Sequence, residues 1–313
     1  MESMQRRPDV SIIVVSYNTR EMTVAALESV YKSEGDVAFE VVVVDNASTD
    51  GSADAIAERL PQVRLIRSAE NLGFGRANNI AAEAAQGRYI LLLNPDTLVL
   101  PTSLRSLMDF AKDQPQARIW GGRTVFADVS LNPTSVWPGP SLWSLTCAAL
   151  LLTGLFKNSS VLNPEAYGGW RRDDLREVDI VLLIETDLWR ALKGFDPEFF
   201  MYAEEADLCN RGRQLGARPM FTPNSTIVHN GGASETARGP KLARLYAGKV
   251  TFMRKHWSPL RYRRGVGMYL SHVLICWIAY GAIRLATRSA RARGSFEAWR
   301  HVWRNRPDWV HGY

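Results

Sequence analysis

The stretch "LLLNPDTLVL", residues 91–100, ends a hydrophobic run on a single carboxylate. The run begins at Tyr89 and stays apolar as far as Leu93, after which the chain continues with Asn94-Pro95-Asp96. A short continuous apolar run of this kind is typical of a strand that is buried on both faces of a sheet. We therefore expect Asp96 to lie at the carboxyl end of a buried strand, just before the chain turns.

Three similar apolar runs precede this stretch, and a segment with helical spacing follows each of them. The predicted strands cover residues 10–17, 39–48, 63–70 and 88–96, and the predicted helices cover residues 20–33, 51–60 and 75–87. Strands that alternate with helices across short loops indicate an α/β fold, with a mostly parallel, Rossmann-like sheet flanked by helices.

Polar side chains follow each of the four predicted strands. They are Ser16, Tyr17 and Asn18, then Asp45, Asn46 and Ser48, then Asn71, with Gly73 in the same loop, and finally Asn94 and Asp96. Ligands of open α/β sheets bind outside the carboxyl ends of the strands, so these side chains should meet at one crevice. Asn, Asp and Ser also cap helices and turns, which is the simpler interpretation for any single residue. Four strand ends together favour a binding site.

Several classes of protein are disfavoured by the sequence. No G-x-G-x-x-G follows the first strand and no P-loop is present, which argues against nicotinamide or ATP chemistry of those kinds. The three cysteines, Cys147, Cys209 and Cys276, form neither a disulfide framework nor a metal cluster, which favours a reducing compartment. The N-terminal apolar run has only the length of a strand, so we expect no signal peptide.

Five motifs in order resemble family 2 glycosyltransferases of the GT-A fold, and within that family the bacterial rhamnosyltransferase-type enzymes. The motifs are "VSIIVVSYN" (10–18), "VVVVDNASTDGS" (41–52), "NLGFGRANN" (71–79), "LLLNPDT" (91–97) and "GFDPEFFMYAEEADLCNR" (194–211). The resemblance runs from about residue 9 to residue 235. It implies a nucleotide-diphosphate sugar as donor, Mg²⁺ or Mn²⁺ as cofactor, and an inverting displacement.

The resemblance also assigns donor-site and metal-site residues. The family's D-x-D motif falls on Asn94-Pro95-Asp96, which makes Asp96 a metal ligand and Asn94 a group that orients a sugar hydroxyl or the ribose. His229, in "TIVHNGGAS" (226–234), matches a family histidine near the metal, although a lone histidine is more often structural. The expected donor-binding residues are Ser16, Tyr17, Asn18, Asp45, Asn46, Asn71, Phe74, Asn78 and Asn94. For Phe74, simple core packing is an equally good interpretation.

The second half should supply the general base, because the acceptor hydroxyl must lose its proton as it attacks. By resemblance, "YAEEADL" places Glu205 at the position of the catalytic aspartate, with Glu204 and Asp207 beside it. The alternative is an acidic first helical turn that complements the helix dipole. A small-residue segment that the family commonly has before "LLIETDLWRALKGFD" (182–196) is missing here.

The basic charge of the protein is concentrated in residues 240–313. They hold fifteen Lys and Arg against two acidic residues, a net charge of +13, and five of the ten tryptophans. Such a composition suits an anionic membrane surface, and we find no signature of a nucleic-acid-binding module. Within it, residues 265–283 carry no charge but have arginines on both sides. That pattern predicts an interfacial or re-entrant helix rather than a span, with a true span as the alternative.

A second apolar run, residues 141–156, predicts a helix that either contacts a lipid-linked acceptor or belongs to the core. We expect a GT-A domain over residues 1–239, with the donor half in 1–100 and the acceptor and catalytic half in 101–239. Residues 240–313 would form a helical membrane-associating tail on the cytoplasmic face of the inner membrane, peripheral or monotopic. Nothing in the sequence excludes a homo-oligomer.

The expected function is a metal-dependent, inverting hexosyltransferase in cell-surface polysaccharide synthesis. Its donor would be a nucleotide-diphosphate sugar, with dTDP-rhamnose suggested by the resemblance alone. Its acceptor would be a glycan, with a polyprenyl-diphosphate-linked one favoured. The alternative is a catalytically silent GT-A module that acts as a membrane-bound scaffold or sugar-nucleotide sensor, because Asn94, Glu205 and the missing small-residue segment depart from the family pattern.

Overall fold

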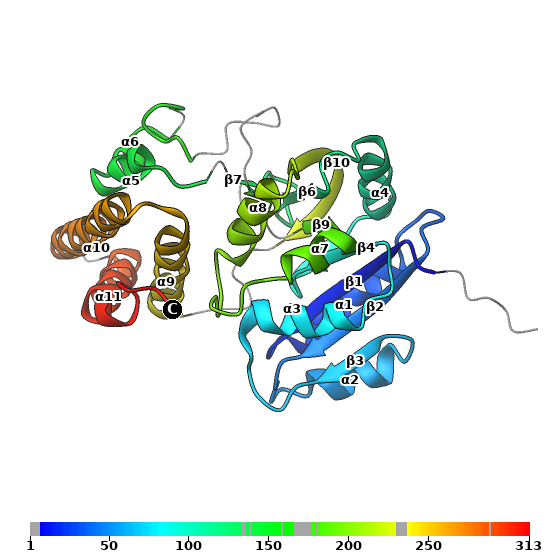
Figure 1. Ribbon diagram of the computed structural model, residues 1–313. Coiled ribbons are helices and arrows are strands. Elements are labelled where there is room, and N and C mark those ends of the chain that lie inside the picture. Colours follow the sequence, from blue (N-terminus) through cyan, green and yellow to red (C-terminus); the bar gives the residue numbers. More distant parts are fainter. Residues whose placement is uncertain are drawn as a thin grey trace, which may run out of the picture. The chain divides into compact units, whose positions relative to one another are not determined.

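The computed structural model describes most of the chain (Figure 1). The described residues are 7–132, 136–137, 139–157, 159–165, 177–178, 181–229, 237–287 and 289–313. The glycines that follow His229 in the motif 226–234 lie outside these ranges, as do residues 171–176 and 179–180, which precede the strand that starts at Val181.

The first hundred residues form the alternating strands and helices that the sequence predicts. In order they are β1 (Val10–Ser16), α1 (Arg20–Tyr31), β2 (Phe39–Asp45), α2 (Ser52–Arg59), β3 (Arg64–Arg67), α3 (Gly73–Glu83) and β4 (Tyr89–Leu93). The second half continues with β5 (Thr97–Val99), α4 (Ser103–Asp113), β6 (Ile119–Val125), β7 (Val136–Trp137), α5 (Leu142–Ala149), α6 (Leu152–Leu155), β8 (Glu177–Val178), β9 (Val181–Glu185), α7 (Thr186–Leu192), α8 (Glu204–Gln214) and β10 (Met220–His229). Three long helices follow, α9 (Arg238–His256), α10 (Pro259–Thr287) and α11 (Ala290–Arg304), and then a 3-10 turn, η1 (Arg306–Asp308).

The main sheet has eight strands in the order β3-β2-β1-β4-β9-β6-β10-β5. Strands β3, β2, β1 and β4 pair in parallel, as do β6 and β10. Strand β9 lies antiparallel between β4 and β6, and β5 pairs antiparallel with β10 at the edge. The prediction of an α/β fold with a mostly parallel sheet is confirmed, and β9 and β5 are the antiparallel exceptions.

Helices cover both faces of this sheet because consecutive strand residues point to opposite sides. On one face, Ile12 and Val43 pack with residues of α1, α2 and α4. On the other face, Ile13 and Val42 pack with residues of α3, α7 and α8. Strands β1, β2 and β4 are therefore largely buried on both faces, which explains why their sequences are continuous apolar runs rather than alternating ones.

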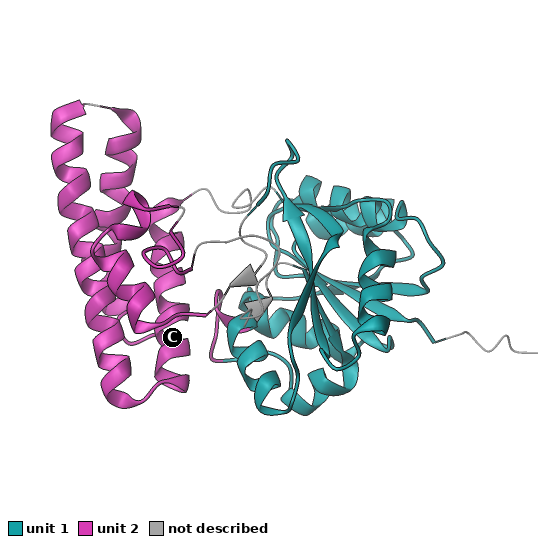
Figure 2. Ribbon diagram, turned by 90° about the horizontal axis from the view of Figure 1, so that it is seen from above, with its two compact units in different colours: residues 1–137, 170–197, 205–234 teal, residues 138–169, 198–204, 235–313 magenta. Residues whose placement is uncertain are grey.

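The chain divides into two compact units (Figure 2). The α/β unit comprises residues 1–137, 170–197 and 205–234, and the helical unit comprises residues 138–169, 198–204 and 235–313. The helical unit has a core of its own, in which Leu145 packs with residues of α9, α10 and α11. Besides the predicted tail, the helical unit thus contains the segment of α5 and α6 and a short stretch just before Glu205.

The apolar run 265–283 lies within α10, as predicted, and the tryptophan-bearing segment after it forms α11. Among the described residues, α10 is the one helix long and apolar enough to cross a membrane, judged by length and composition. The other apolar run, 141–156, forms two helices, because the backbone of Leu151 adopts a left-handed conformation (φ 59°) between them.

Candidate functional site

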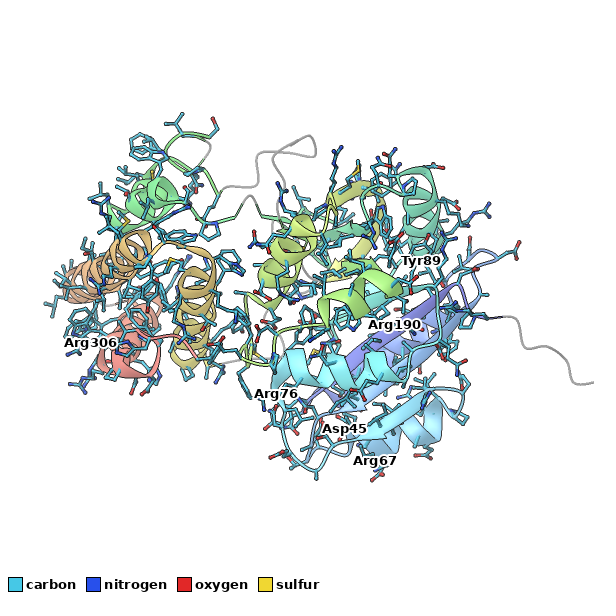
Figure 3. The ribbon with its side chains drawn as sticks, viewed as in Figure 1. Asp45, Arg67, Arg76, Tyr89, Arg190 and Arg306 are labelled. Atoms are coloured by element: carbon cyan, nitrogen blue, oxygen red, sulfur yellow. The ribbon has the colours of Figure 1, made fainter. Side chains whose placement is uncertain are left out.

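The sheet register brings the carboxyl ends of β1, β2, β4 and β10 to the same side of the sheet, which we call the carboxyl edge. Ser16 is paired with Asp45, so β1 and β2 end side by side, and β4 runs parallel to β1. Strand β10 also runs in this direction, because β9 is antiparallel to both β4 and β6 while β6 and β10 are parallel. Figure 3 shows Asp45 at this edge and Tyr89, the first residue of β4, at the opposite one. The strand-end residues and His229 therefore belong to the same side of the sheet.

Asp96 and His229 lie side by side at this edge. Strands β5 and β10 pair so that Thr97 is opposite His229, which places the preceding residue, Asp96, against the imidazole. Asp96 Oδ1 lies 3.3 Å from His229 Nε2, and the two side chains are only 4% and 9% exposed. The pair is thus almost completely shielded from water. In such surroundings a carboxylate and an imidazole interact much more strongly than at the surface.

Asn132 holds the His229 ring from the other side. Its Nδ2 donates to the His229 carbonyl oxygen at 3.0 Å and lies 3.3 Å from the ring Nδ1. Asn132 is itself buried, in the segment that follows β6. Sequence reasoning missed this residue, because no motif surrounds it and it lies far from His229 along the chain. The two contacts from Asn132 fix the orientation of the His229 ring.

Asp96 and His229 fit a divalent cation whose remaining ligands come from outside the protein. A carboxylate oxygen and an imidazole nitrogen are both ligands that Mn²⁺ accepts, and Mg²⁺ is commonly held by one or two carboxylates plus substrate phosphates and water. Within the described ranges, no group of three His, Cys, Asp or Glu side chains is arranged to hold an ion. The pair would therefore depend on ligands such as phosphate oxygens to complete the coordination.

Asp45 has a buried carboxylate oxygen that is available to a ligand. It is buried at the end of β2, and its Oδ2 accepts a hydrogen bond from the Ser48 amide at 3.2 Å. Its other oxygen, Oδ1, is buried and has no hydrogen-bond partner among the described residues. A buried oxygen without a partner is costly, which suggests that a ligand donor completes it. Tyr17 nearby in the motif of β1 is 46% exposed, so its ring is available for stacking.

Other strand-end residues form hydrogen bonds within the protein. Ser16 Oγ is buried and lies within hydrogen-bonding distance of the hydroxyls of Thr19 and Thr23. Asn18 adopts a left-handed conformation (φ 52°), and its Oδ1 accepts from the Thr49 amide at 2.8 Å. The Asn18 contacts tie the loop after β1 to the loop after β2. Ser16 and Asn18 therefore shape the site by fixing the backbone around it.

Asn46 and Asn71 interact with each other. Asn46 Nδ2 donates to Asn71 Oδ1 at 3.0 Å, and Asn46 Oδ1 accepts from the Leu72 amide at 2.9 Å. Asn71 Oδ1 also accepts from the Gly73 amide. The pair thus orders the loop that leads into α3.

Phe74 and Asn78 belong to the first turns of α3. The Phe74 ring lies 5.9 Å from the Phe195 ring, so core packing, one of the two expected roles, is observed. Asn78 is buried, and its Nδ2 donates to the Phe74 carbonyl at 2.9 Å. Asn94, by contrast, is partly exposed, and its carbonyl oxygen accepts from the Thr97 hydroxyl at 2.7 Å, which closes the turn that carries Asp96.

The three acids of α8 occupy different environments. Glu204 is buried and belongs to the helical unit, whereas Glu205 is partly exposed and begins the next part of the α/β unit. Asp207 is fully buried, and its Oδ2 accepts from Arg211 Nε at 2.6 Å. Arg211 also donates to the carbonyl oxygens of Leu192, the last residue of α7, and of Gly194, two residues further on. Asp207 is therefore engaged with Arg211, and Glu205 is the most accessible of the three carboxylates.

The sequence model of glycosyl transferase family 2 matches residues 11–175, which is more than half of the chain. The chain belongs to this family. The matched region of the glycosyltransferase includes β1, β2 and β4 with their polar ends, and the Asp96 turn.

The glycosyltransferase is similar in sequence to an N-acetylglucosaminyl-diphospho-decaprenol L-rhamnosyltransferase of Mycobacterium tuberculosis. The two are 29% identical over 262 residues, which cover 75% of this chain and 83% of the relative. The expected likeness to rhamnosyltransferase-type enzymes is thus confirmed.

Solved glycosyltransferase structures share the fold. The mannosyltransferase PcManGT from Pyrobaculum calidifontis, determined with GDP-Man and Mn²⁺, aligns with a TM-score of 0.57 at 18% identity, over 95% of this chain and 86% of that one. Residues 1–349 of S. aureus TarS, determined with UDP, align with a TM-score of 0.53 at 15% identity, over 96% and 91% of the two chains. At these identities the likeness concerns the GT-A fold, which is the fold predicted from the sequence.

Proposed function

We propose that this glycosyltransferase moves a sugar, with inversion, from a nucleotide-diphosphate sugar to a polyprenyl-diphosphate-linked glycan in cell-surface polysaccharide synthesis. The observation that carries the proposal is the buried Asp96–His229 pair at the edge of the sheet where Asp45 keeps a buried oxygen without a described partner. The sequence relative named for a decaprenol-linked acceptor supports the choice of acceptor.

The donor nucleotide would bind at the ends of β1 and β2. Asp45 Oδ1 would accept a hydrogen bond from the base or ribose, and the exposed ring of Tyr17 would stack on the base. The sugar would extend toward Asn94 and the turn that carries Asp96. The name of the Mycobacterium relative makes dTDP-rhamnose the first donor to test. In this assignment residues 1–100 form the donor half of a GT-A domain that extends to residue 239.

Asp96 and His229 would hold a divalent cation, Mg²⁺ or Mn²⁺, together with oxygens of the donor diphosphate. Such an ion neutralises the negative charge that the diphosphate gains as its bond to the sugar breaks. Asn132 would keep the His229 ring in place through its bonds to the ring and the carbonyl. The complex of PcManGT with Mn²⁺ is consistent with this role for the metal.

Glu205 would act as the general base. The acceptor oxygen forms a bond to the anomeric carbon while the bond from that carbon to the diphosphate oxygen breaks, and the acceptor proton passes to a Glu205 carboxylate oxygen. One displacement of this kind inverts the configuration at the anomeric carbon. Glu204 is the next candidate, whereas Asp207 is engaged with Arg211.

The helical unit would hold the enzyme on the cytoplasmic face of the inner membrane as a peripheral or monotopic protein. Its exposed large apolar side chains among the described residues are Trp143, Leu150, Leu155, Phe156, Val161, Phe200, Leu260, Ile278, Ile283 and Leu285. Only 17% of the most apolar window of α10 is buried within the protein, and exposed arginines such as Arg261 and Arg264 begin this helix. Apolar side chains beside arginines suit the boundary between acyl chains and anionic head groups.

A donor panel tests the proposed function. The purified protein would be titrated with UDP-, GDP- and dTDP-sugars, in Mg²⁺, Mn²⁺ or EDTA, and then incubated with the donor that binds and a polyprenyl-diphosphate N-acetylglucosamine. We expect metal-dependent binding of one nucleotide class and release of its nucleoside diphosphate during transfer. Donor binding without sugar transfer would favour a catalytically silent module instead. No response to any donor would refute both the proposed transferase function and the silent module.

A further inference from the structure

The segment that leads into Glu205 has a strained backbone. Residues 198–204 belong to the helical unit, although Glu205 begins the next part of the α/β unit. Tyr202 and Ala203, immediately before α8, both have left-handed backbones, with φ of 72° and 70°. This conformation is rare for residues with a side chain and costs energy at each position, so it persists only where surrounding contacts hold it. Strain of this kind is common next to catalytic groups.

Tyr313 supplies one of these contacts. Its hydroxyl donates to the carbonyl oxygen of Met201 at 2.6 Å and also lies 3.1 Å from that of Arg244 in α9. Its own backbone is fixed, because its amide donates to Thr251 Oγ1 at 2.8 Å and its carbonyl accepts from Arg254 Nη2 at 3.0 Å. Burial raises the pKa of the Tyr313 hydroxyl far above its usual range, so the hydroxyl stays protonated and can donate.

Gly248 supplies the second contact. A Cβ at this position of α9 would lie 2.2 Å from the carbonyl oxygen of Tyr202, a backbone atom that cannot move aside without moving the turn. The glycine therefore lets α9 approach the strained residues directly. At the start of the segment, Glu198 is paired with Lys255 at 2.8 Å and with Arg254, both from the last turn of the same helix.

We propose that Gly248 and Tyr313 are positioning residues that hold the left-handed turn at Tyr202 and Ala203 and thereby set the start of α8, which carries Glu205. The proposal rests on the proposed function of Glu205 as general base. The C-terminal helical unit then has two tasks, membrane association and the placement of the base. A change in these contacts should act on the chemical step and leave the donor site, which lies in the α/β unit, unaffected.

The first test separates turnover from donor binding. We expect Tyr313→Phe, which removes one hydroxyl, to lower kcat about tenfold, and Gly248→Ala, which displaces the turn, to lower kcat by up to about 100-fold. The nucleotide Kd should stay within about twofold of the wild-type value in both. Two matched controls should keep kcat: Tyr262→Phe, whose hydroxyl has no hydrogen bond among the described residues, and Gly267→Ala, whose Cβ would meet no described atom within 4 Å.

The second test does not depend on activity. Hydrogen exchange of full-length wild type and Tyr313→Phe should show faster exchange of the amides of residues 201–208 in the variant, with β1 unchanged. If exchange there stays the same and kcat matches the Tyr262→Phe control, the positioning role is refuted. If the wild type transfers no sugar at all, the proposed function fails instead, and the exchange comparison still decides whether Tyr313 orders the turn.

Discussion

Replacing Asp96 with asparagine tests the metal site, because it removes the charge with almost no change in shape. The new amide side chain would keep an oxygen that accepts from His229 Nε2, so the 3.3 Å contact between the two side chains can persist. We therefore expect the free energy of unfolding without metal to change by less than about 1 kcal/mol. Metal-dependent donor binding, which needs the negative charge, should fall much more.

The burial of the pair sets the magnitude. Both side chains are at most 9% exposed, so water screens the lost charge very little. Interactions of a charged group in such surroundings contribute about 1.5 to 3 kcal/mol. Since each 1.4 kcal/mol is a factor of ten, Asp96→Asn should weaken nucleotide binding in Mn²⁺ by about 10- to 150-fold.

Calorimetric titration of the nucleoside diphosphate that binds the wild type, in Mn²⁺ and in EDTA, measures this effect. In EDTA the variant and the wild type should bind alike, because the lost interaction passes through the ion. Asp109→Asn is the control, since Asp109 lies on α4 and its side chain is 56% exposed. If Asp96→Asn gains as much from Mn²⁺ as the wild type does, Asp96 is not a metal ligand.

Four further outcomes follow from the site and the helical unit. Glu205→Gln should lower kcat by about 100-fold or more while the nucleotide Kd stays constant. Asp207→Asn should instead lower the thermal unfolding temperature, because it leaves the partly buried Arg211 without its carboxylate, at a cost of about 3 kcal/mol. Equal unfolding temperatures of this variant and the wild type would contradict a structural role of Asp207. Asp45→Ala should weaken nucleotide binding about tenfold in EDTA as well as in Mn²⁺, which titration would show, since in the proposed donor site its free oxygen binds the base or ribose rather than an ion. Flotation with vesicles that contain anionic lipid should show that 1 M salt releases only part of the bound protein. Salt screens the +13 charge of residues 240–313 but does not weaken the burial of apolar side chains. Complete release of the protein would exclude insertion of the apolar side chains.

The sequence was sufficient for the α/β half because its signals are local. The runs of β1, β2 and β4 are largely buried on both faces, and each run of the first hundred residues is followed by turn residues, so strand limits were predicted to within a few positions. The antiparallel strands β5 and β9 were not predicted. Three residues, as in β5, carry no periodicity, and the direction of β9 depends on long-range pairing with β4 and β6.

The site was predictable as a set of residue types and less so as a set of contacts. The match to the family motifs named Asp96 and His229, and the structure brings them together. No local pattern could identify Asn132, which reaches His229 only through the packing of distant segments. Nor could a motif tell that Asn46 and Asn71 bond to each other, because a side-chain amide serves a ligand or a loop equally well.

The pairing of β5 with β10 has a consequence for synthesis of the protein on the ribosome. Strands β1 to β4 can pair as soon as their residues emerge, since each connection between them is short. The partner of Asp96 comes from the last third of the chain, and closing such a long loop costs entropy that the pairing of β10 with β5 and β6 offsets. A nascent chain that ends before β10 therefore lacks His229, one of the two residues proposed to hold the cation. If the proposed metal site is correct, metal-induced protection from proteolysis would report the last stage of folding.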